Sequence, residues 1–193
     1  MKVIIIKYNA GNTCSVDIAL QRIGINAILS DDATEIRSAD KVIFPGVGAA
    51  ASAMQYLKER NLHKVIKELN QPLLGICLGM QLLCAYSEEG DTNCLGVFPQ
   101  TVKQFKGTIK VPQVGWNNVS TLKTSLFYGV SENEYMYFVH SYYAGINENT
   151  IAATDYCGKY SAALQKGNFY AVQFHPEKSA KAGQKILENF IAL

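Results

Sequence analysis

The sequence lacks a strong excess of charge of either sign. Its 193 residues include 18 Lys and Arg against 16 Asp and Glu, which gives a formal net charge of +2. No stretch holds the roughly five or six like charges that are typical of a nucleic-acid-binding arm. We therefore expect no nucleic acid partner. The hydrophobic fraction of 48% is typical of a globular protein and excludes a disordered or collagen-like chain.

Long apolar runs are also absent. Near the N-terminus only Val3–Ile6 are consecutively apolar, which is shorter than the roughly 7–15 residues of a signal-peptide core. The longest nearly apolar stretch runs from 73 to 86 and is interrupted by Gln81, whereas a membrane-spanning helix needs roughly 18 apolar residues. These absences predict a cytoplasmic protein with no membrane partner.

The cysteines show no metal-binding or disulfide pattern. They form an odd set of five, Cys14, Cys77, Cys84, Cys94 and Cys157. The set has no Cys-x-x-Cys pair and no metal-ligand spacing with a histidine. The sequence has no GxxxxGK phosphate loop, and Gly46-Val47-Gly48 is too short a pattern to indicate a dinucleotide site. We expect reduced thiols, no metal and no cofactor.

The first half of the chain alternates short apolar runs with amphipathic stretches. Strands are predicted at 3–6, 27–29, 41–44 and 73–76, and helices at 13–23, 49–60, 62–69 and 78–86. We expect Thr13 to cap the first helix and Gly24 to end it. The alternation predicts a three-layer α/β fold, in which a mostly parallel central sheet has helices on both faces and its sites at the carboxyl ends of the strands.

The second half has a different pattern. Short strands are predicted at 102–105, 116–119, 135–139, 151–154 and 161–165, and we expect them to be antiparallel additions to the sheet. A buried strand at 169–174 precedes a closing helix at 180–191, for which Ser179 is the expected N-cap. Because no repeat, linker or low-complexity segment divides the chain, we expect one domain, residues 1–193.

Gly75-Ile76-Cys77-Leu78-Gly79 lies between a predicted strand and a predicted helix. This is the context of a nucleophile elbow with Cys in place of Ser. The elbow strains the backbone of its nucleophile, so glycines are needed on either side where a Cβ would collide with neighbouring chain. The sulfur would lie at a helix N-terminus, which favours the reactive thiolate. The alternative is that Cys77 is a small core residue.

Gln173-Phe174-His175-Pro176-Glu177 follows the last predicted strand. Because Pro176 disfavours a helical backbone at His175, the side chains of His175 and Glu177 should project together. A carboxylate beside an imidazole supports its positive charge, as a general base requires. The alternative is a surface histidine beside a solvated glutamate. The order Cys, His, Glu differs from the order in α/β-hydrolases, where the acid precedes the histidine on a separate loop.

Gly75–Gln81 together with His175-Pro176-Glu177 resembles the class I (triad) glutamine amidotransferases, over essentially the whole chain. The resemblance implies a flavodoxin-like fold and hydrolysis of L-glutamine to glutamate and ammonia. In this reaction Cys77 would attack the amide, His175 would transfer protons and Glu177 would orient the imidazole. The backbone N–H of Leu78 would hold the oxyanion, together with that of Val47 after a peptide rearrangement. The implied substrate-binding residues are Gly46, Gly48, Gln81, His140, Ser141 and Tyr142.

Taken singly, two of these residues have simpler interpretations. Gln81 could be a helix-surface residue, and His140 could be a core histidine with satisfied hydrogen bonds.

Further segments resemble the glutaminase subunits of imidazole glycerol phosphate synthases. These are 9–12, 45–48, 115–117, 137–142 and 175–179. The resemblance implies a TIM-barrel synthase partner that receives the ammonia and makes imidazole glycerol phosphate and aminoimidazole carboxamide ribotide in histidine biosynthesis. It places Asn12, Trp116, Tyr137 and Lys178 at or near the partner interface. The alternatives are a solvated Lys178 and a core Trp116.

Three residues depart from the pattern of these subunits. Lys7 stands where Asp is usual, Ala50 where Phe is usual and Gln113 where His is usual, and none belongs to the triad. Two other functions stay open at this point. The chain could be the glutaminase of another synthase, in pyridoxal phosphate or purine synthesis, or a non-enzymatic binding paralogue.

Overall fold

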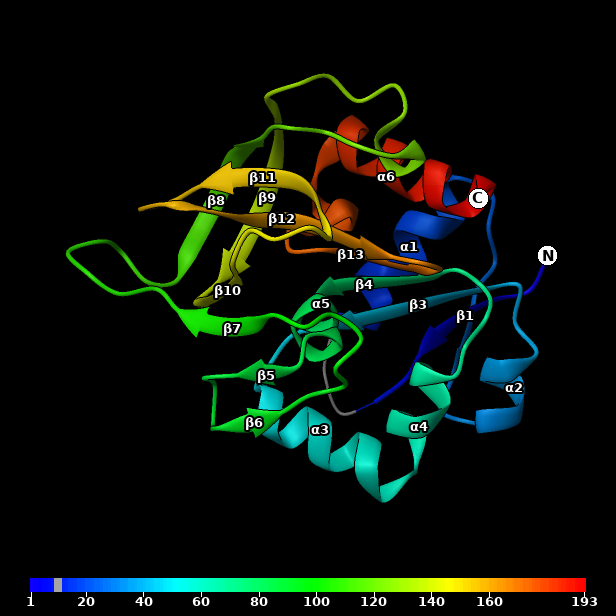
Figure 1. The fold of residues 1–193 in the computed structure, drawn as a ribbon. Helices are drawn as coiled ribbons and strands as arrows, with labels where there is room; N and C mark the ends of the chain where they lie inside the picture. Colours follow the sequence, from blue (N-terminus) through cyan, green and yellow to red (C-terminus); the bar gives the residue numbers. More distant parts are fainter. Residues whose placement is uncertain (9–11) are drawn as a thin grey trace.

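A seven-stranded sheet forms the centre of the molecule (Figure 1). The computed structural model describes residues 1–8 and 12–193. In spatial order the sheet comprises β11 (Thr150–Asp155), β12 (Lys159–Lys166), β13 (Phe169–Val172), β4 (Leu73–Cys77), β3 (Lys41–Gly46), β1 (Val3–Ile6) and β2 (Ile28–Ser30). The strands from β13 to β2 are parallel, whereas β12 is antiparallel to both β11 and β13. The predicted mostly parallel sheet is confirmed.

Helices cover both faces of this sheet, as predicted. One face carries α1 (Thr13–Arg22), α6 (Ala180–Ala192) and the short 3-10 helix η1 (Ser125–Phe127). The other carries α2 (Ala33–Arg37), α3 (Ala50–Glu59), α4 (Leu62–Lys67) and α5 (Leu78–Leu83). Alternate residues of β1 pack on opposite sides: Ile4 and Ile6 contact the second group of helices, Val3 and Ile5 the first. A parallel strand buried on both faces is apolar throughout.

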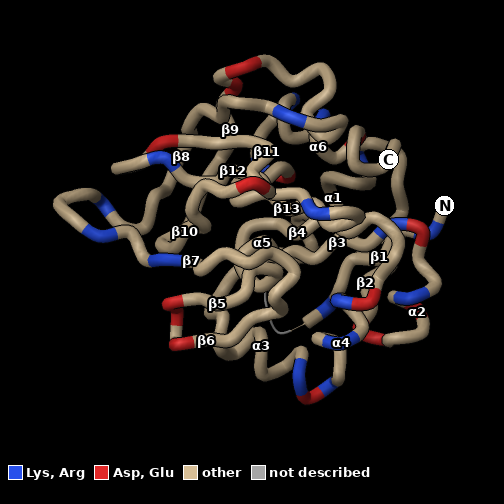
Figure 2. The backbone as a smooth tube through the Cα atoms, viewed as in Figure 1, with Lys and Arg blue, Asp and Glu red and all other residues tan. Residues whose placement is uncertain are grey.

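Charged residues lie mostly outside the central strands (Figure 2). β1, β4 and β13 contain none, and β3 has only Lys41 at its first position. In the part of the chain that the structure describes, none of the helices has both the length and the apolar character of a membrane span.

Residues 86–144 build two further sheets. β8 (Gln113–Val119) and β9 (Glu134–His140) form a hairpin of their own. β10 (Tyr142–Ala144), β7 (Thr101–Gln104), β5 (Tyr86–Ser87) and β6 (Thr92–Asn93) form a four-stranded sheet. Of the five short strands predicted as antiparallel additions to the main sheet, those at 151–154 and 161–165 are confirmed as β11 and β12. The prediction is wrong for the other three, which join the two further sheets. The reason is that β9 already pairs with β8 and buries Met136 and Phe138 against the core beneath α6.

Local signals also differ from expectation at three helices. α2 was not predicted, because five residues are too few to show a helical period; the Asp32 carboxylate caps it by accepting from the Glu35 N–H at 2.8 Å. The helix predicted to reach residue 86 ends at Leu83, since Cys84 is extended and leads into β5. Thr13 does not cap α1: the N-cap is Asn12, in a left-handed conformation.

The carboxyl ends of three adjacent strands meet at one place. Gly46 of β3 pairs with Cys77 of β4, and Ile76 pairs with Val172 of β13. The segment that continues from β13 therefore begins beside Cys77. This is the edge of the sheet where sites of α/β proteins form.

Candidate active site

Cys77 has the strained backbone of a nucleophile elbow. Its φ and ψ are 53° and −107°, directly between β4 and α5. A Cβ on Gly79 would lie 1.8 Å from the carbonyl oxygen of Phe44, and one on Gly75 would lie 2.7 Å from Leu83 Cδ1. The two glycines thus allow α5 to pack directly on β3 and β4. The prediction that a Cβ at these glycines would collide with neighbouring chain is confirmed.

His175 and Glu177 form an ion pair beyond β13. His175 is extended before Pro176, and its Nδ1 lies 2.8 Å from Glu177 Oε1. Their side chains are only 2% and 0% exposed. The Asn12 amide donates a hydrogen bond to the same carboxylate oxygen. Burial disfavours the charged imidazole, but the hydrogen bonds and charges of Cys77 and Glu177 outweigh burial and raise the pKa of His175 to about 10.

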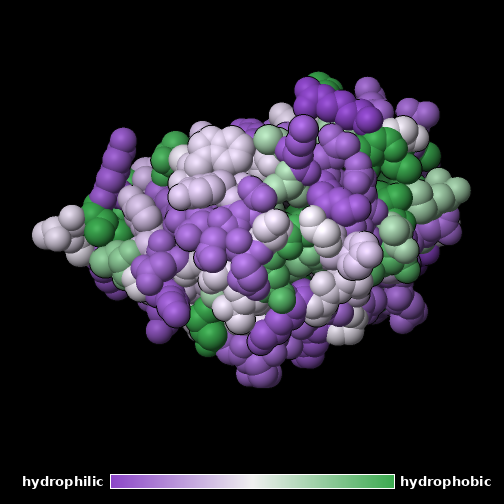
Figure 3. Space-filling model, turned by 90° about the horizontal axis from the view of Figure 1, so that it is seen from above, coloured by the Kyte–Doolittle hydropathy of each residue, from purple (hydrophilic) through white to green (hydrophobic). Residues whose placement is uncertain are grey.

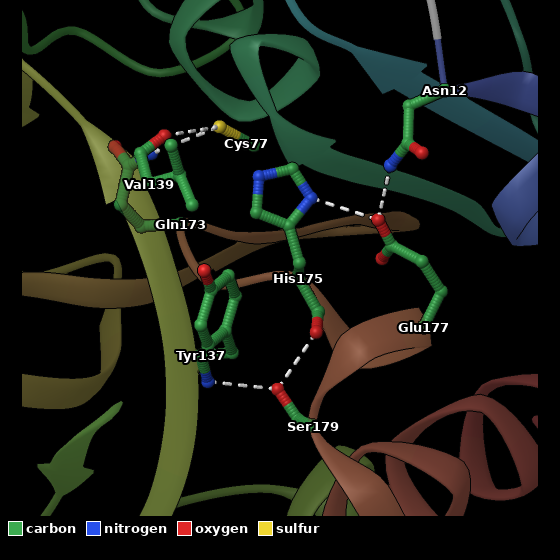
Figure 4. A network of polar contacts seen from close by, with 8 residues as sticks. All are labelled: Asn12, Cys77, Tyr137, Val139, Gln173, His175, Glu177 and Ser179. Atoms are coloured by element: carbon green, nitrogen blue, oxygen red, sulfur yellow. Dashed lines mark hydrogen bonds and ion pairs between the residues drawn. The ribbon is translucent and has the colours of Figure 1, made fainter. Parts of the chain in front are cut away.

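The His175 imidazole lies between the sulfur and the carboxylate (Figure 4). The sulfur also has two polar neighbours at 3.7 Å, the carbonyl oxygen of Val139 and Nε2 of Gln173. The structure therefore brings together the three residues that the sequence predicts as catalytic. The geometry allows the imidazole to exchange a proton with Cys77 while Glu177 fixes its orientation.

Ser179 links the histidine segment to β9. Its hydroxyl donates to the carbonyl oxygen of His175 at 2.7 Å and accepts from the N–H of Tyr137 at 2.9 Å (Figure 4). Ser179 is the N-cap residue of α6 as predicted, but its side chain makes no capping hydrogen bond. The hydroxyl instead fixes the backbone that carries His175.

A pocket of about 300 Å³ opens onto the sulfur. Its lining residues are Val47, Gly48, Cys77, Leu78, Gln81, Glu89, Pro112, Val139, His140, Ser141, Tyr142, His175 and Lys178. The volume lies at the lower end of the range for small-molecule sites, roughly 300–1,000 Å³, and suits a molecule the size of an amino acid. All but one of the predicted substrate-binding residues line it, and Gly46 is the exception.

Gln81 and His140 both hold the carbonyl oxygen of Tyr142. Gln81 Nε2 donates to it at 2.9 Å and to Gln173 Oε1 at 3.0 Å, and the side chain is buried, so the helix-surface alternative is wrong. His140 Nδ1 lies 2.7 Å from the same oxygen, and Nε2 lies 3.1 Å from the Tyr160 hydroxyl. Burial lowers the pKa of His140 to about 4, against the hydrogen bond to Tyr142, so this imidazole is neutral. Both ring nitrogens have a polar neighbour, and the side chain is part of the core.

Position 46 has no room for a side chain, so it requires glycine. A Cβ there would lie 2.1 Å from the hydroxyl of Tyr8, which donates to the carbonyl oxygen of Pro45 at 2.6 Å. Tyr8 therefore fixes the chain just before the glycine loop.

The loop beyond Gly46 has more freedom. Gly48 has a φ of +116°, a Cβ added to it would have nothing within 4 Å, and Val47 is 36% exposed. The N–H of Leu78, the first residue of α5, has no partner within its helix and lies next to the nucleophile. These are the two N–H groups predicted to hold an oxyanion, and their role stays a prediction.

The hairpin of β8 and β9 exposes aromatic residues. Trp116 is 52% exposed and packs edge-on against Tyr137, with ring centroids 5.8 Å apart, so the core alternative for Trp116 is wrong. Val114 and Tyr135 are 53% and 58% exposed. Alternation along the two strands puts these four side chains on one face, and we call them the hairpin face.

The other two predicted interface residues lie near the triad. Asn12 is partly buried on Glu177, and Lys178 is exposed at the rim of the pocket. Residues 9–11 of the segment quoted with Asn12 lie outside the described residues.

Among the site residues that the sequence analysis did not predict, two have polar side chains. Glu89 lines the pocket, and its Oε2 accepts from the N–H of Ala50 at 2.8 Å. Gln173 is fully buried between Gln81 and the sulfur. Gln173 stands at the end of the strand predicted at 169–174, two positions before His175, and this i, i+2 relation was the available signal. Nothing in the sequence marked Glu89.

Two of the three departures from the family pattern make hydrogen bonds, Ala50 with its backbone and Gln113 with its side chain. The backbone of Ala50 contacts Glu89, and Gln113 Oε1 accepts from the Tyr160 hydroxyl at 2.7 Å. Lys7 is exposed. Within residues 1–8 and 12–193, no group of three or more His, Cys, Asp or Glu could hold a metal ion.

Comparison with known proteins agrees with this site. A family profile described as glutamine amidotransferase class-I matches residues 5–193. An imidazole glycerol phosphate synthase subunit HisH from Bacteroides fragilis (strain YCH46) is 56% identical over 196 residues, with 100% of both chains covered. The HisH subunit of Idiomarina loihiensis is 41% identical and covers 100% of this chain and 98% of its own.

Solved structures show the same fold at low identity. A putative GMP synthase protein from Thermoplasma acidophilum has a TM-score of 0.78 at 22% identity, covering 100% of this chain and 93% of its own. PurLQS from Thermotoga maritima has a TM-score of 0.74 at 15% identity, covering 99% and 97%. The chain therefore belongs to the class I glutamine amidotransferases and, within them, to the HisH subunits of imidazole glycerol phosphate synthase.

Proposed function

We propose that Cys77, His175 and Glu177 hydrolyse L-glutamine and that the ammonia passes to a TIM-barrel synthase subunit docked over the pocket. The observation that carries this proposal is the position of the His175 imidazole between the sulfur and a fully buried carboxylate. The raised pKa of His175 keeps the imidazole protonated beside Cys77 at neutral pH. An imidazolium paired with a thiolate is the resting state from which such a nucleophile attacks.

The reaction proceeds in two halves. The Cys77 thiolate attacks the side-chain amide carbon, and the resulting oxyanion accepts from the N–H of Leu78 and, after rotation of the loop, from that of Val47. His175 then gives its proton to the departing nitrogen, so ammonia leaves and a thioester remains. In the second half His175 takes a proton from water, hydroxide adds to the thioester, and its collapse returns thiolate and glutamate.

Polar groups around the pocket match the two ends of an amino acid. The substrate α-ammonium carries a positive charge, and Glu89 is the acidic residue in the pocket lining. Gln81 uses both hydrogens of Nε2 within the protein, which leaves Oε1 as an acceptor for the ammonium. The backbone N–H groups of Ser141 and Tyr142 are suited to the α-carboxylate. Gly46 would act by giving the oxyanion loop room to move.

The hairpin face is the proposed docking surface. It consists of Val114, Trp116, Tyr135 and Tyr137, and β9 continues from it to Val139 in the pocket wall. Exposed Trp and Tyr side chains are enriched at the centres of protein interfaces. Figure 3 shows one face of the molecule, on which hydrophobic residues form separate patches among hydrophilic ones. A partner seated on the hairpin face would also cover the pocket mouth, where ammonia must be kept from water.

The remaining parts of the proposal follow from the family. The synthase partner would use the ammonia to make imidazole glycerol phosphate and aminoimidazole carboxamide ribotide in histidine biosynthesis, in the cytoplasm. Lys178 would contact the partner from the pocket rim. Asn12, because it donates to Glu177, would connect that interface to the triad. We also propose that residues 1–193 act as one domain, since strands from both halves share the central sheet.

The deciding experiment measures ammonia release from glutamine with and without the barrel partner and its ribonucleotide substrate. We expect weak activity alone, strong stimulation by both, and loss of stimulated activity in Cys77→Ala. Stimulated ammonia release that persists in Cys77→Ala would exclude the triad. Full activity without the partner would keep the triad and remove the partner assignment, and silence in every condition would favour a binding paralogue.

A further inference from the structure

A buried amide touches the reacting sulfur and has no part in the mechanism above. Gln173 is 0% exposed and follows β13, at the level of Cys77 in the sheet. Its Nε2 lies 3.7 Å from the sulfur, and its Oε1 accepts from Gln81 Nε2 at 3.0 Å. The side chain therefore connects the nucleophile to the pocket wall.

Neighbouring groups fix which end of this amide faces the sulfur. The backbone carbonyl of Tyr142 can only accept, so the Gln81 atom 2.9 Å from it is the nitrogen. The second hydrogen on that nitrogen points to Gln173, whose nearer atom must then be the oxygen. His140 holds the same carbonyl oxygen at 2.7 Å from the other side. As a consequence, an N–H of Gln173 faces Cys77.

The sulfur has a different polar neighbour for each protonation state. A thiol can donate to the carbonyl oxygen of Val139 at 3.7 Å, but a thiolate is repelled by that oxygen. The N–H of Gln173 suits only an accepting sulfur. We infer that Gln173 is a further catalytic residue, which donates a hydrogen bond to the Cys77 thiolate and holds it in line with the pocket. This inference rests on the proposed function of Cys77.

The other titratable groups around the sulfur have roles that differ from the one inferred for Gln173. His175 supplies the positive charge, with Glu177 behind it. Burial and the Cys77 charge raise the pKa of Tyr8 well above its ordinary value, and burial likewise raises the pKa of Tyr160, so both phenols stay neutral. The Tyr8 hydroxyl donates to Pro45 and not to the sulfur.

The test compares the intact protein with Gln173→Met, which keeps the shape of the side chain and removes its N–H. Iodoacetamide alkylation of Cys77 is followed by peptide mass spectrometry from pH 5 to 10. A hydrogen bond to a charged group is worth about one or two powers of ten, so half-maximal reactivity should move up by about one pH unit. Partner-stimulated kcat/KM at pH 7 should fall about tenfold. The exposed thiols Cys14 and Cys157 report on the same samples and should not change.

Two further variants keep the test decisive. Gln173→Leu also removes the N–H without adding a charge, and it should shift the profile in the same direction even if Gln173→Met does not fold. Asn189→Leu removes another buried amide, which donates to Leu126 and Tyr128 from α6, and it should lower stability without moving the Cys77 profile.

The possible outcomes distinguish a failure of this inference from a failure of the proposed function. An unchanged Cys77 profile in both Gln173 variants, with an active wild-type protein, would overturn the inference alone. Wild-type protein without glutaminase activity, whose Cys77 reacts like Cys14, would overturn the proposed function as well.

Discussion

Two buried histidines near Cys77 have pKa values that shift in opposite directions. His175 gains Cys77 and Glu177 as partners, and its pKa rises to about 10 despite burial. His140 lies against a carbonyl and a phenol, neither of which is charged, so burial dominates and the pKa of His140 falls to about 4. One imidazole is built to carry charge and the other to stay neutral. Protonation of His175 stabilises the folded protein. This stabilisation is complete below pH 6.5, the ordinary pKa of histidine, and it is lost as the pH rises towards about 10, the pKa of His175 in the folded protein.

The opposite sign applies to His140 and can be measured. As the pH falls from 6.5 to about 4, the unfolded chain binds a proton on His140 that the folded protein does not, so stability is lost over this range. The shift corresponds to roughly 3 kcal/mol. His140→Asn keeps an N–H for the Tyr142 carbonyl but does not titrate. Urea unfolding at pH 6.5 and pH 4 should therefore show a smaller fall in the free energy of unfolding for the variant, and equal falls would contradict this.

At the scale of elements, the elbow depends on how closely α5 packs against the sheet. Gly75 and Gly79 allow contact between backbones, and the positive φ of Cys77 turns the chain sharply from β4 into α5. The strain at Cys77 is offset by burial of the apolar side chains on both elements. A side chain in this contact would separate the helix from the strand and displace the sulfur.

Gly79→Ala should show this directly. Its Cβ would lie 1.8 Å from the Phe44 carbonyl oxygen, so the variant should lose about 3 kcal/mol or more of stability, or fail to fold. Gly24→Ala is the matched control, because Gly24 has a φ of +79° but open space around it. It should cost about 1 kcal/mol. The free energy of unfolding of both variants is measured by urea unfolding. Equal losses would show that the close contact of α5 with the sheet does not account for the effect of Gly79→Ala.

At the scale of the whole molecule, the pocket and the hairpin face share β9. Val139 of this strand borders the sulfur, while Tyr137 packs against exposed Trp116. Ser179 in turn joins Tyr137 to the backbone of His175. A partner that presses on the hairpin face therefore contacts a strand that touches two members of the triad.

Trp116→Ala should weaken binding of the barrel subunit. Loss of a central interface tryptophan typically raises the dissociation constant by about tenfold or more. Isothermal titration calorimetry with the barrel subunit measures this. Ile28→Ala serves as the control, since Ile28 is 45% exposed but lies at the amino end of the edge strand β2, away from the pocket. Equal binding by wild type and Trp116→Ala would place the interface elsewhere.

Part of the structure of this protein is determined by short segments of its sequence. The apolar runs of β1, β3 and β4 predict buried parallel strands, because only strands covered on both faces lack alternation. Gly75, Cys77 and Gly79 between a strand and a helix predict the elbow, and His175 before Pro176 predicts its alignment with Glu177. These inferences succeed because each depends on backbone geometry within a few residues.

What remained was decided by contacts between distant segments. The sequence could not show that β8 and β9 pair only with each other, that Trp116 lies outside, or that Asn12 reaches Glu177 across 165 positions of the chain. Gln81 and Gln173 are ordinary polar residues until the fold buries them together. A buried amide without partners costs several kcal/mol in lost hydrogen bonds, and only tertiary packing determines which partners are within reach.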